Sequence, residues 1–240
     1  MTALNEFIFL LIVYAGGVIS STFGIGGAFI IIPLSALLLP IKKAIVILTV
    51  FFLVNDTSKA VVFRKYIDWR AVLLLWIGAI PGVILGAYSL VIASPVVVER
   101  ILGAIILAYV VNSLFGLTKH LKLSDSAIVV GGFGYGFFAG IIGTGGPIKA
   151  AILIQLGLRK EKFIATMSSN AVLLNIIKMA IYSKYSLILR SDIMVMGFLV
   201  LVAVIAALTG KFFVKKITPT VFERIVMSIL LISGIKLLFF

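Results

Sequence analysis

The chain has 240 residues, of which 62% are hydrophobic, and its mean hydropathy of +1.30 is far above that of a soluble domain, which is roughly half apolar. The net charge of +13 comes from short basic clusters between apolar segments, a pattern typical of membrane-protein loops, and this argues against nucleic-acid binding. Without cysteine, a Walker-type motif or an HExxH motif, the chain has no residues for thiolate metal sites, disulfides or ATP-driven transport. We therefore expect an all-α polytopic membrane protein that needs no cofactor.

Eight apolar segments follow one another along the chain. Six are close to the length of about 20 residues that one membrane crossing needs. Residues 3–39 and 126–158 are too long, since the first would extend for about 55 Å as one helix against a hydrocarbon core of about 30 Å. The first segment carries no signal-peptide cleavage pattern, so we expect it to remain as an anchor. The six ordinary helices are predicted at residues 44–63, 71–94, 97–118, 163–183, 193–214 and 221–240.

Each overlong segment contains a glycine-rich interruption. Three glycines in four residues disfavour a helix, because each costs about 1 kcal/mol relative to alanine. Freed N–H groups at membrane depth are tolerated only where they are buried in protein or line a cavity, so paired interruptions indicate a substrate site. The alternative is that the glycines serve only close helix packing. The interruptions are Gly24, Ile25, Gly26 and Gly27 in the first segment, and Gly143, Thr144, Gly145 and Gly146 in the second.

Two sets of residues recur at fixed offsets, which indicates an internal duplication. The chain is therefore predicted to consist of two repeats, residues 1–120 and 121–240, which form one transport domain. Each repeat holds one overlong segment and three helices. The first set recurs 119 residues later: Gly17, Gly24, Gly26, Gly27 and Lys59 correspond to Gly136, Gly143, Gly145, Gly146 and Lys178. The second set recurs 124 residues later: Asp68, Gly86, Pro95, Glu99 and Arg100 correspond to Asp192, Gly210, Pro219, Glu223 and Arg224.

The positions of the basic residues indicate how the repeats are oriented. If each overlong segment crosses the membrane once, the 18 loop lysines and arginines divide ten to eight between the two sides. If each segment folds back at its glycines, they divide twelve to six, which is the asymmetry expected of a real topology. We therefore predict two glycine-broken hairpins in inverted repeats, with both termini outside and the hairpin tips meeting near the midplane.

Polar residues recur in the second helix of each repeat. The helix at 44–63 carries Asn55, Asp56 and Lys59, and its counterpart carries Asn175 and Lys178. Charges at this depth cost several kcal/mol unless they are compensated, so they usually face the interior and mark a pathway. The alternative for both lysines is that their side chains reach back to the membrane surface. Asp56 is a candidate proton carrier or charge partner.

Lys149 follows the second interruption and is predicted to lie roughly 15 Å deep. Pro147 suits the first turn of a half-helix, so Lys149 would lie near a helix N-terminus. A cation is unfavourable there unless an anion compensates it, and this predicts an anion site. The alternative is a salt bridge to Asp56. Aromatic residues such as Phe52 and Tyr135 are predicted to serve packing rather than substrate binding.

At these motifs the chain resembles the sulfite exporter TauE/SafE family over essentially its full length. The resemblance implies transport of sulfite, thiosulfate, sulfoacetate or related organic anions, often as export after sulfonate breakdown. One branch of the family, which takes up thiosulfate, looks to depend on cysteines, so their absence favours the sulfite or sulfonate exporters. The motifs are Gly24-Ile25-Gly26-Gly27 with Pro33, Gly143-Thr144-Gly145-Gly146-Pro147, Ser94-Pro95 and Thr218-Pro219.

We thus expect a secondary transporter that exports small sulfur-containing anions across the cell membrane. An inside-negative potential favours anion exit by about 2.3 kcal/mol per charge per 100 mV, so export needs no coupling ion. The open alternatives are a passive anion channel, a carrier of small carboxylates and a scaffold protein. The protein could also form a homo-oligomer. The sequence contains no residue set typical of an intramembrane enzyme. The expected partners are the lipid bilayer and a small anion. The predicted substrate-binding residues are Lys149, Gly24, Ile25, Gly26, Gly27, Gly143, Thr144, Gly145, Gly146, Asn55, Lys59, Asn175 and Lys178.

Overall fold

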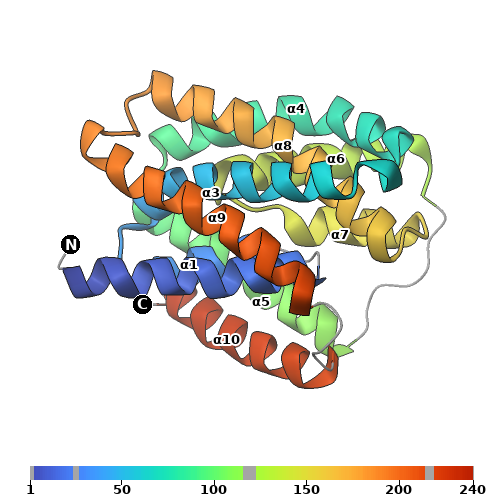
Figure 1. The fold of residues 1–240 in the computed structure, drawn as a ribbon. Coiled ribbons are helices and arrows are strands. Elements are labelled where there is room, and N and C mark those ends of the chain that lie inside the picture. Colours follow the sequence, from blue (N-terminus) through green and yellow to red (C-terminus); the bar gives the residue numbers. More distant parts are fainter. Residues whose placement is uncertain (1–2, 24–26, 116–122, 214–218, 240) are drawn as a thin grey trace.

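The computed structural model describes residues 3–23, 27–115, 123–213 and 219–239, and Figure 1 shows these ranges as a bundle of helices. They contain no strand, which confirms the all-α prediction. Short 3-10 turns, η1 (Arg64–Tyr66) and η2 (Arg190–Asp192), precede α4 and α9. The helices are α1 (Ala3–Phe23), α2 (Gly27–Ser35), α3 (Ile41–Val62), α4 (Trp69–Ile92), α5 (Pro95–Phe115), α6 (Asp125–Ile141), α7 (Gly146–Gln155), α8 (Lys160–Lys184), α9 (Ile193–Phe213) and α10 (Pro219–Phe239).

Several helix starts follow from their sequence. The side chains of Asp68 and Ser124 accept hydrogen bonds from Ala71 N and Ala127 N and so cap α4 and α6. Pro95 begins α5, where its missing N–H costs nothing.

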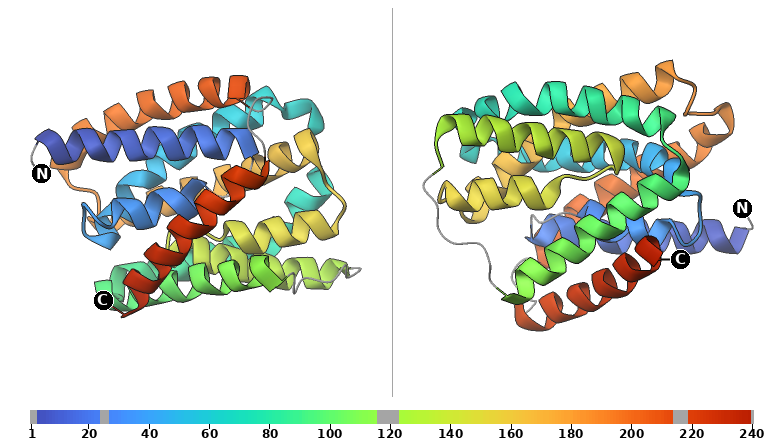
Figure 2. Two further views of the ribbon diagram at one scale, coloured as in Figure 1. Left: turned by 90° about the horizontal axis from the view of Figure 1, so that it is seen from below. Right: turned by 180° about the vertical axis from the view of Figure 1, so that it is seen from behind.

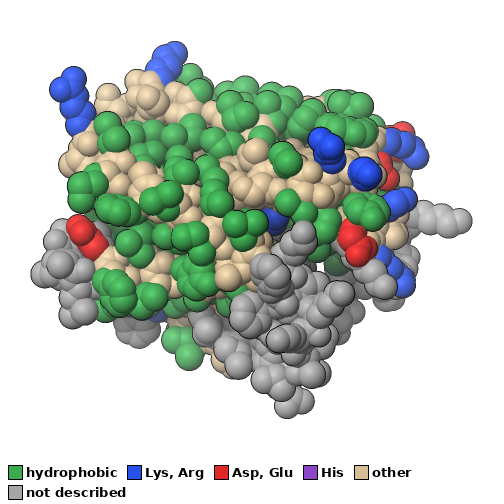
Figure 3. Space-filling model, in the orientation of Figure 1, with side chains coloured by type: hydrophobic (Ala, Val, Ile, Leu, Met, Phe, Trp, Pro, Cys, Tyr) green, Lys and Arg blue, Asp and Glu red, His purple; other side chains and the backbone are tan. Residues whose placement is uncertain are grey.

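Within the residues that the structure describes, five helices are long and apolar enough to cross a membrane. They are α3, α4, α5, α8 and α9, judged by length and composition. The face of the molecule in Figure 3 carries hydrophobic side chains across its middle, and lysine and arginine side chains gather toward its two ends. This distribution fits a multi-pass membrane protein whose helices run between the two basic ends.

Contacts between distant residues define these two ends. At the first end, Lys43 pairs with Asp192 at 2.8 Å, so the start of α3 lies beside the start of α9. At the second end, Arg70 pairs with Asp125 at 2.9 Å, so the start of α4 lies beside the start of α6. The backbone N–H of Asp68 donates to Thr166 Oγ1 at 3.0 Å, which places the start of α8 at the second end as well.

The two overlong segments are each divided into two helices, α1 with α2 and α6 with α7. In each pair the helices pack against one another (Figure 2). Helix α2 leads through residues 36–40 into α3 at the first end, and α7 leads through residues 156–159 into α8 at the second end. The two hairpins therefore open toward opposite ends of the molecule. Their relation as inverted repeats in a membrane stays a prediction.

The helices between the hairpins bring the polar residues to the centre. Helix α3 packs against α8, α1 against α9, and α6 against α4. The α4–α6 contact is close because α4 presents glycine to the backbone of α6: a Cβ at Gly86 would lie 2.0 Å from Phe137 O. Glycine thus permits close helix packing on α4, which lies outside the two interruptions. The α3–α8 contact is the one that forms the candidate site.

Candidate functional site

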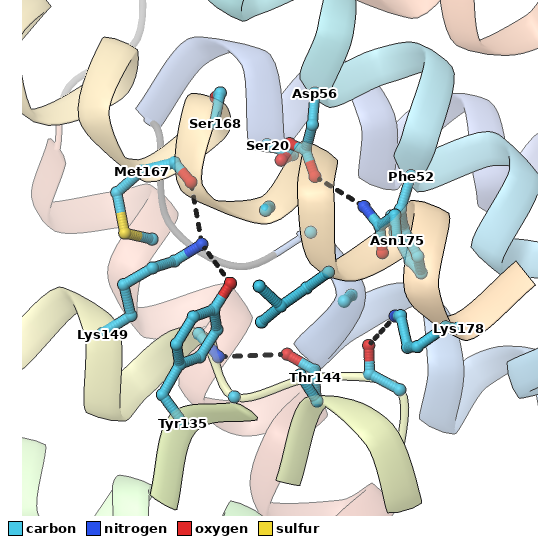
Figure 4. A pocket seen from close by; sticks show the side chains of 18 of the residues that line it. Ser20, Phe52, Asp56, Tyr135, Thr144, Lys149, Met167, Ser168, Asn175 and Lys178 are labelled. Atoms are coloured by element: carbon cyan, nitrogen blue, oxygen red, sulfur yellow. Dashed lines mark hydrogen bonds between the residues drawn. The ribbon is translucent and has the colours of Figure 1, made fainter. Parts of the chain in front are cut away.

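A cavity of about 70 Å³ lies where the two hairpins meet α3 and α8 (Figure 4). A cavity needs only about 10–15 Å³ to hold one water molecule, so this one has room for several waters or for a small anion. Its walls come from α1, α2, α3, α6, α7, α8 and the loop before α7. The lining residues are Ser20, Gly27, Ala28, Phe52, Asp56, Lys59, Tyr135, Ala139, Gly143, Thr144, Gly145, Gly146, Lys149, Met167, Ser168, Ala171, Leu174, Asn175 and Lys178.

Two half-helices begin at this cavity. Gly27 is the first residue of α2 and Gly146 the first of α7, and both line the cavity. The first N–H groups of a helix lack intrahelical acceptors and carry a partial positive charge, so two such ends favour an anion. The other predicted residues of the first interruption, Gly24, Ile25 and Gly26, lie outside the described residues.

The loop before α7 depends on glycine at two positions. Gly143 has a φ of +79°, a left-handed conformation that residues with a Cβ rarely adopt. A Cβ at Gly145 would lie 2.2 Å from Tyr135 O, so only glycine lets this loop approach α6. Between them, Thr144 Oγ1 accepts a hydrogen bond from Gly146 N at 3.3 Å. All four residues line the cavity.

We expect Gly145→Ala to destabilise the protein, because the added methyl group would meet the backbone of α6. Overpacking typically costs about 1–3 kcal/mol, and a backbone neighbour yields less readily than a side chain. Gly134→Ala is a matched control on α6, since its Cβ would meet only Ile148 Cδ1 at 4.0 Å. Thermal unfolding in detergent should show a clearly lower midpoint for the first variant alone. Equal midpoints would contradict the close approach of the loop.

Lys149 is buried in the first turns of α7, with 4% of its surface exposed. Its ammonium donates to Tyr135 OH at 3.0 Å and to Met167 O at 2.8 Å, and it lies 4.6 Å from the centroid of the Tyr135 ring. An ammonium has three N–H donors, so one remains for a ligand in the cavity. Within the described residues Lys149 forms no ion pair, so the alternative of a salt bridge to Asp56 does not hold.

Asp56 pairs with a lysine of its own helix. Asp56 Oδ1 lies 2.8 Å from Lys59 Nζ, and Asp56 Oδ2 accepts from Asn175 Nδ2 of α8 at 3.3 Å. Lys59 also donates to Ser20 Oγ of α1 at 3.4 Å and is 6% exposed. Its ammonium therefore points inward and does not reach back to the membrane surface.

Lys178 of α8 is also held inside, with 2% of its surface exposed. Its ammonium donates to Gly143 O at 3.5 Å, a long contact, and forms no ion pair with a described carboxylate. Together with Lys59 and Lys149 it gives the described lining three lysines against one carboxylate, that of Asp56. The lining is thus formally positive, which suits an anion.

The structure places Asn55 outside the cavity lining. It is 1% exposed and is not among the lining residues. Its side-chain amide donates to Ser21 Oγ and to Ala203 O, both at 3.3 Å. Asn55 therefore joins α1, α3 and α9, and its predicted role in substrate binding stays a prediction.

A comparison with protein-family models decides the identity. The model of the sulfite exporter TauE/SafE family matches residues 8–237. The chain belongs to this family. Its members are transporters of sulfur-containing anions rather than enzymes, so this TauE/SafE protein is a membrane transporter with a small anionic substrate in a lipid environment. No curated protein and no solved structure gave a significant match.

Tyr135 is one cavity residue of this TauE/SafE protein that sequence reasoning missed, and Ser20 is another. Tyr135 was predicted to serve packing, but its hydroxyl accepts the hydrogen bond from Lys149 and lines the cavity. Accepting that bond leaves the phenol hydrogen free for another acceptor, and none is recorded within the described residues. A phenol at membrane depth on the helix before the glycine interruption was the signal that could have identified it. Phe52 also lines the cavity.

Proposed function

We propose that this protein is a secondary transporter that exports a small sulfur oxyanion or organosulfonate, such as sulfite or sulfoacetate, across the cytoplasmic membrane. The anion would bind in the cavity between the hairpin tips. One observation carries the proposal: Lys149 and Lys178 are buried ammonium groups that face the cavity without a carboxylate partner among the described residues. A buried charge costs several kcal/mol when unpaired, and a bound anion removes that cost.

The groups around the cavity suit a tetrahedral or pyramidal oxyanion. The ammonium of Lys149 and the hydroxyl of Tyr135 come from α7 and α6, and both residues line the cavity. The N-terminus of α2 adds backbone N–H groups near Gly27, and that of α7 adds its partial positive charge, since Gly146 N already donates to Thr144 Oγ1 and Pro147 has no N–H. Several donors from different directions can bind separate oxygens of one anion, whereas a halide offers a single atom.

The arrangement of the hairpins suggests alternating access. We propose that residues 1–120 and 121–240 are inverted repeats that rock against each other around the cavity, with both termini outside. The hairpins open toward opposite ends of the molecule, and the polar residues of α3 and α8 lie between them. Each repeat would then close one route to the cavity. The membrane potential would drive an anion outward without a coupling ion.

Transport by purified protein in proteoliposomes tests this function. Sulfite or sulfoacetate loaded inside should leave at a rate that saturates with concentration, and an outward-driving potential should accelerate it. A flux that rises linearly without saturation would indicate a channel. Preferred transport of acetate or another small carboxylate over both sulfur anions would contradict the proposed substrate class, because lysine and amide groups can also bind carboxylates.

We expect Tyr135→Phe to weaken anion binding about tenfold while the ring still packs. The substitution removes one hydrogen-bond donor to a charged ligand, and such bonds contribute about 1.5–3 kcal/mol. Tyr182→Phe is the matched control, because Tyr182 is fully buried and donates to Gly140 O at 2.6 Å but does not line the cavity. It should lower thermal stability and leave affinity unchanged in calorimetric titrations. If Tyr135→Phe and the wild-type protein bind the anion with equal affinity, the Tyr135 hydroxyl does not contact the anion.

A further inference from the structure

The charges around the cavity do not balance. Asp56 compensates Lys59 at 2.8 Å, which leaves the ammonium groups of Lys149 and Lys178 without a described counter-ion. Both side chains are at least 96% buried, so water screens them little. An anion with one negative charge would compensate only one of them. An anion with two would compensate both.

We infer that the cavity selects doubly charged anions and that Lys178 is the residue that determines this selectivity. The inference rests on the proposed transport of sulfur anions and adds the charge of the substrate. Figure 4 shows Lys149 and Lys178 approaching the cavity from opposite sides. They come from different helices, α7 and α8, and both line the cavity.

The two lysines differ in how firmly they are held. Lys149 is bound at 2.8 Å to Met167 O and at 3.0 Å to Tyr135 OH, so its ammonium is fixed. Lys178 has one described partner, Gly143 O, at 3.5 Å, so its N–H donors remain largely available. Lys149 is therefore suited to position the anion, and Lys178 is suited to supply the second charge. Removing Lys178 should thus change the preferred charge more than the ability to bind any sulfonate.

Pairs of anions that share a head group but differ in charge can test this selectivity. At mildly alkaline pH sulfite carries two charges, whereas methanesulfonate has the same three oxygens, a methyl group on its sulfur and one charge. Sulfoacetate and isethionate share a sulfonate and a two-carbon chain, but only sulfoacetate carries a second charge. The small volume of the cavity, about 70 Å³, favours the compact pair.

Calorimetric titration of the purified protein with these four anions should show that the doubly charged member of each pair binds at least about tenfold more tightly, in line with close charge pairs in other complexes. Lys178→Gln should reduce this ratio to near one by weakening the doubly charged anions. Lys178→Arg keeps the charge and should keep the preference. If Lys178→Gln does not fold, the affinities of the wild-type protein for the paired anions still test whether the cavity prefers doubly charged anions.

Two results would overturn the inference while leaving the proposed function intact. One is equal affinity for singly and doubly charged sulfur anions in the wild-type protein. The other is a Lys178→Gln variant that weakens both members of a pair by the same factor. If none of the four anions binds to the folded wild-type protein, the proposed function itself is contradicted as well, so the two failures are distinguishable.

Discussion

Replacing Lys149 with methionine should reduce anion flux in proteoliposomes at least about thirtyfold, while the protein still inserts and folds. Removing one member of a buried charged contact commonly costs about 2–5 kcal/mol in binding. Methionine has a similar length and no charge, so it can fill the space that the lysine stem occupies. The fold should tolerate it because Lys149 has no described carboxylate partner that the substitution would leave unpaired.

Lys65→Met provides the control for this prediction. Lys65 lies exposed in η1 and does not line the cavity. The control should transport at the wild-type rate. Undiminished flux through Lys149→Met, with equal amounts of inserted protein, would show that the anion does not depend on this ammonium and would defeat the assignment.

Replacing Asp56 with asparagine should lower the stability of the anion-free protein by about 3–5 kcal/mol, because Lys59 would become an uncompensated buried charge. The side chains of Asp56 and Lys59 are 17% and 8% exposed. The neutral double variant Asp56→Asn/Lys59→Met should recover much of this loss, since neither charge remains. Saturating sulfite should stabilise the single variant more than wild type, because the anion can replace the missing carboxylate.

Thermal unfolding in detergent measures these effects. Asp125→Asn is the control, since it breaks an ion pair whose side chains are 77% and 58% exposed and should cost at most about 1 kcal/mol. If Asp56→Asn costs no more than this control, or if the double variant is no more stable than the single one, the Asp56–Lys59 pair does not have the structural importance assigned to it.

The sequence predicted the fold class because apolar length and glycine spacing are local properties. The sequence predicts an interruption at Gly143–Gly146, and in the structure α6 ends at Ile141 and α7 begins at Gly146. The prediction that Lys59 and Lys178 face inward also followed from local physics, because a charge at membrane depth needs a partner. The structure brings both side chains to one cavity.

The contacts of individual side chains were harder to predict. Asn55 and Asp56 are adjacent on α3, and neighbouring residues lie about 100° apart around a helix. The sequence does not specify the rotation of α3, so it could not show that Asp56 faces the cavity while Asn55 faces α1 and α9. The pair of Asp56 with Lys59, three residues apart on one helix, was available from sequence spacing but was overlooked.

Anomalous diffraction from crystals grown with selenite tests the position of the anion most directly. Selenite has the shape and charge of sulfite, and its selenium atom can be located independently of the protein. We expect one strong selenium peak in the cavity between Lys149 and Lys178, beside Tyr135, and its loss in crystals of Lys149→Met. A selenium peak elsewhere in the bundle, with none in this cavity, would contradict a substrate site between the hairpin tips.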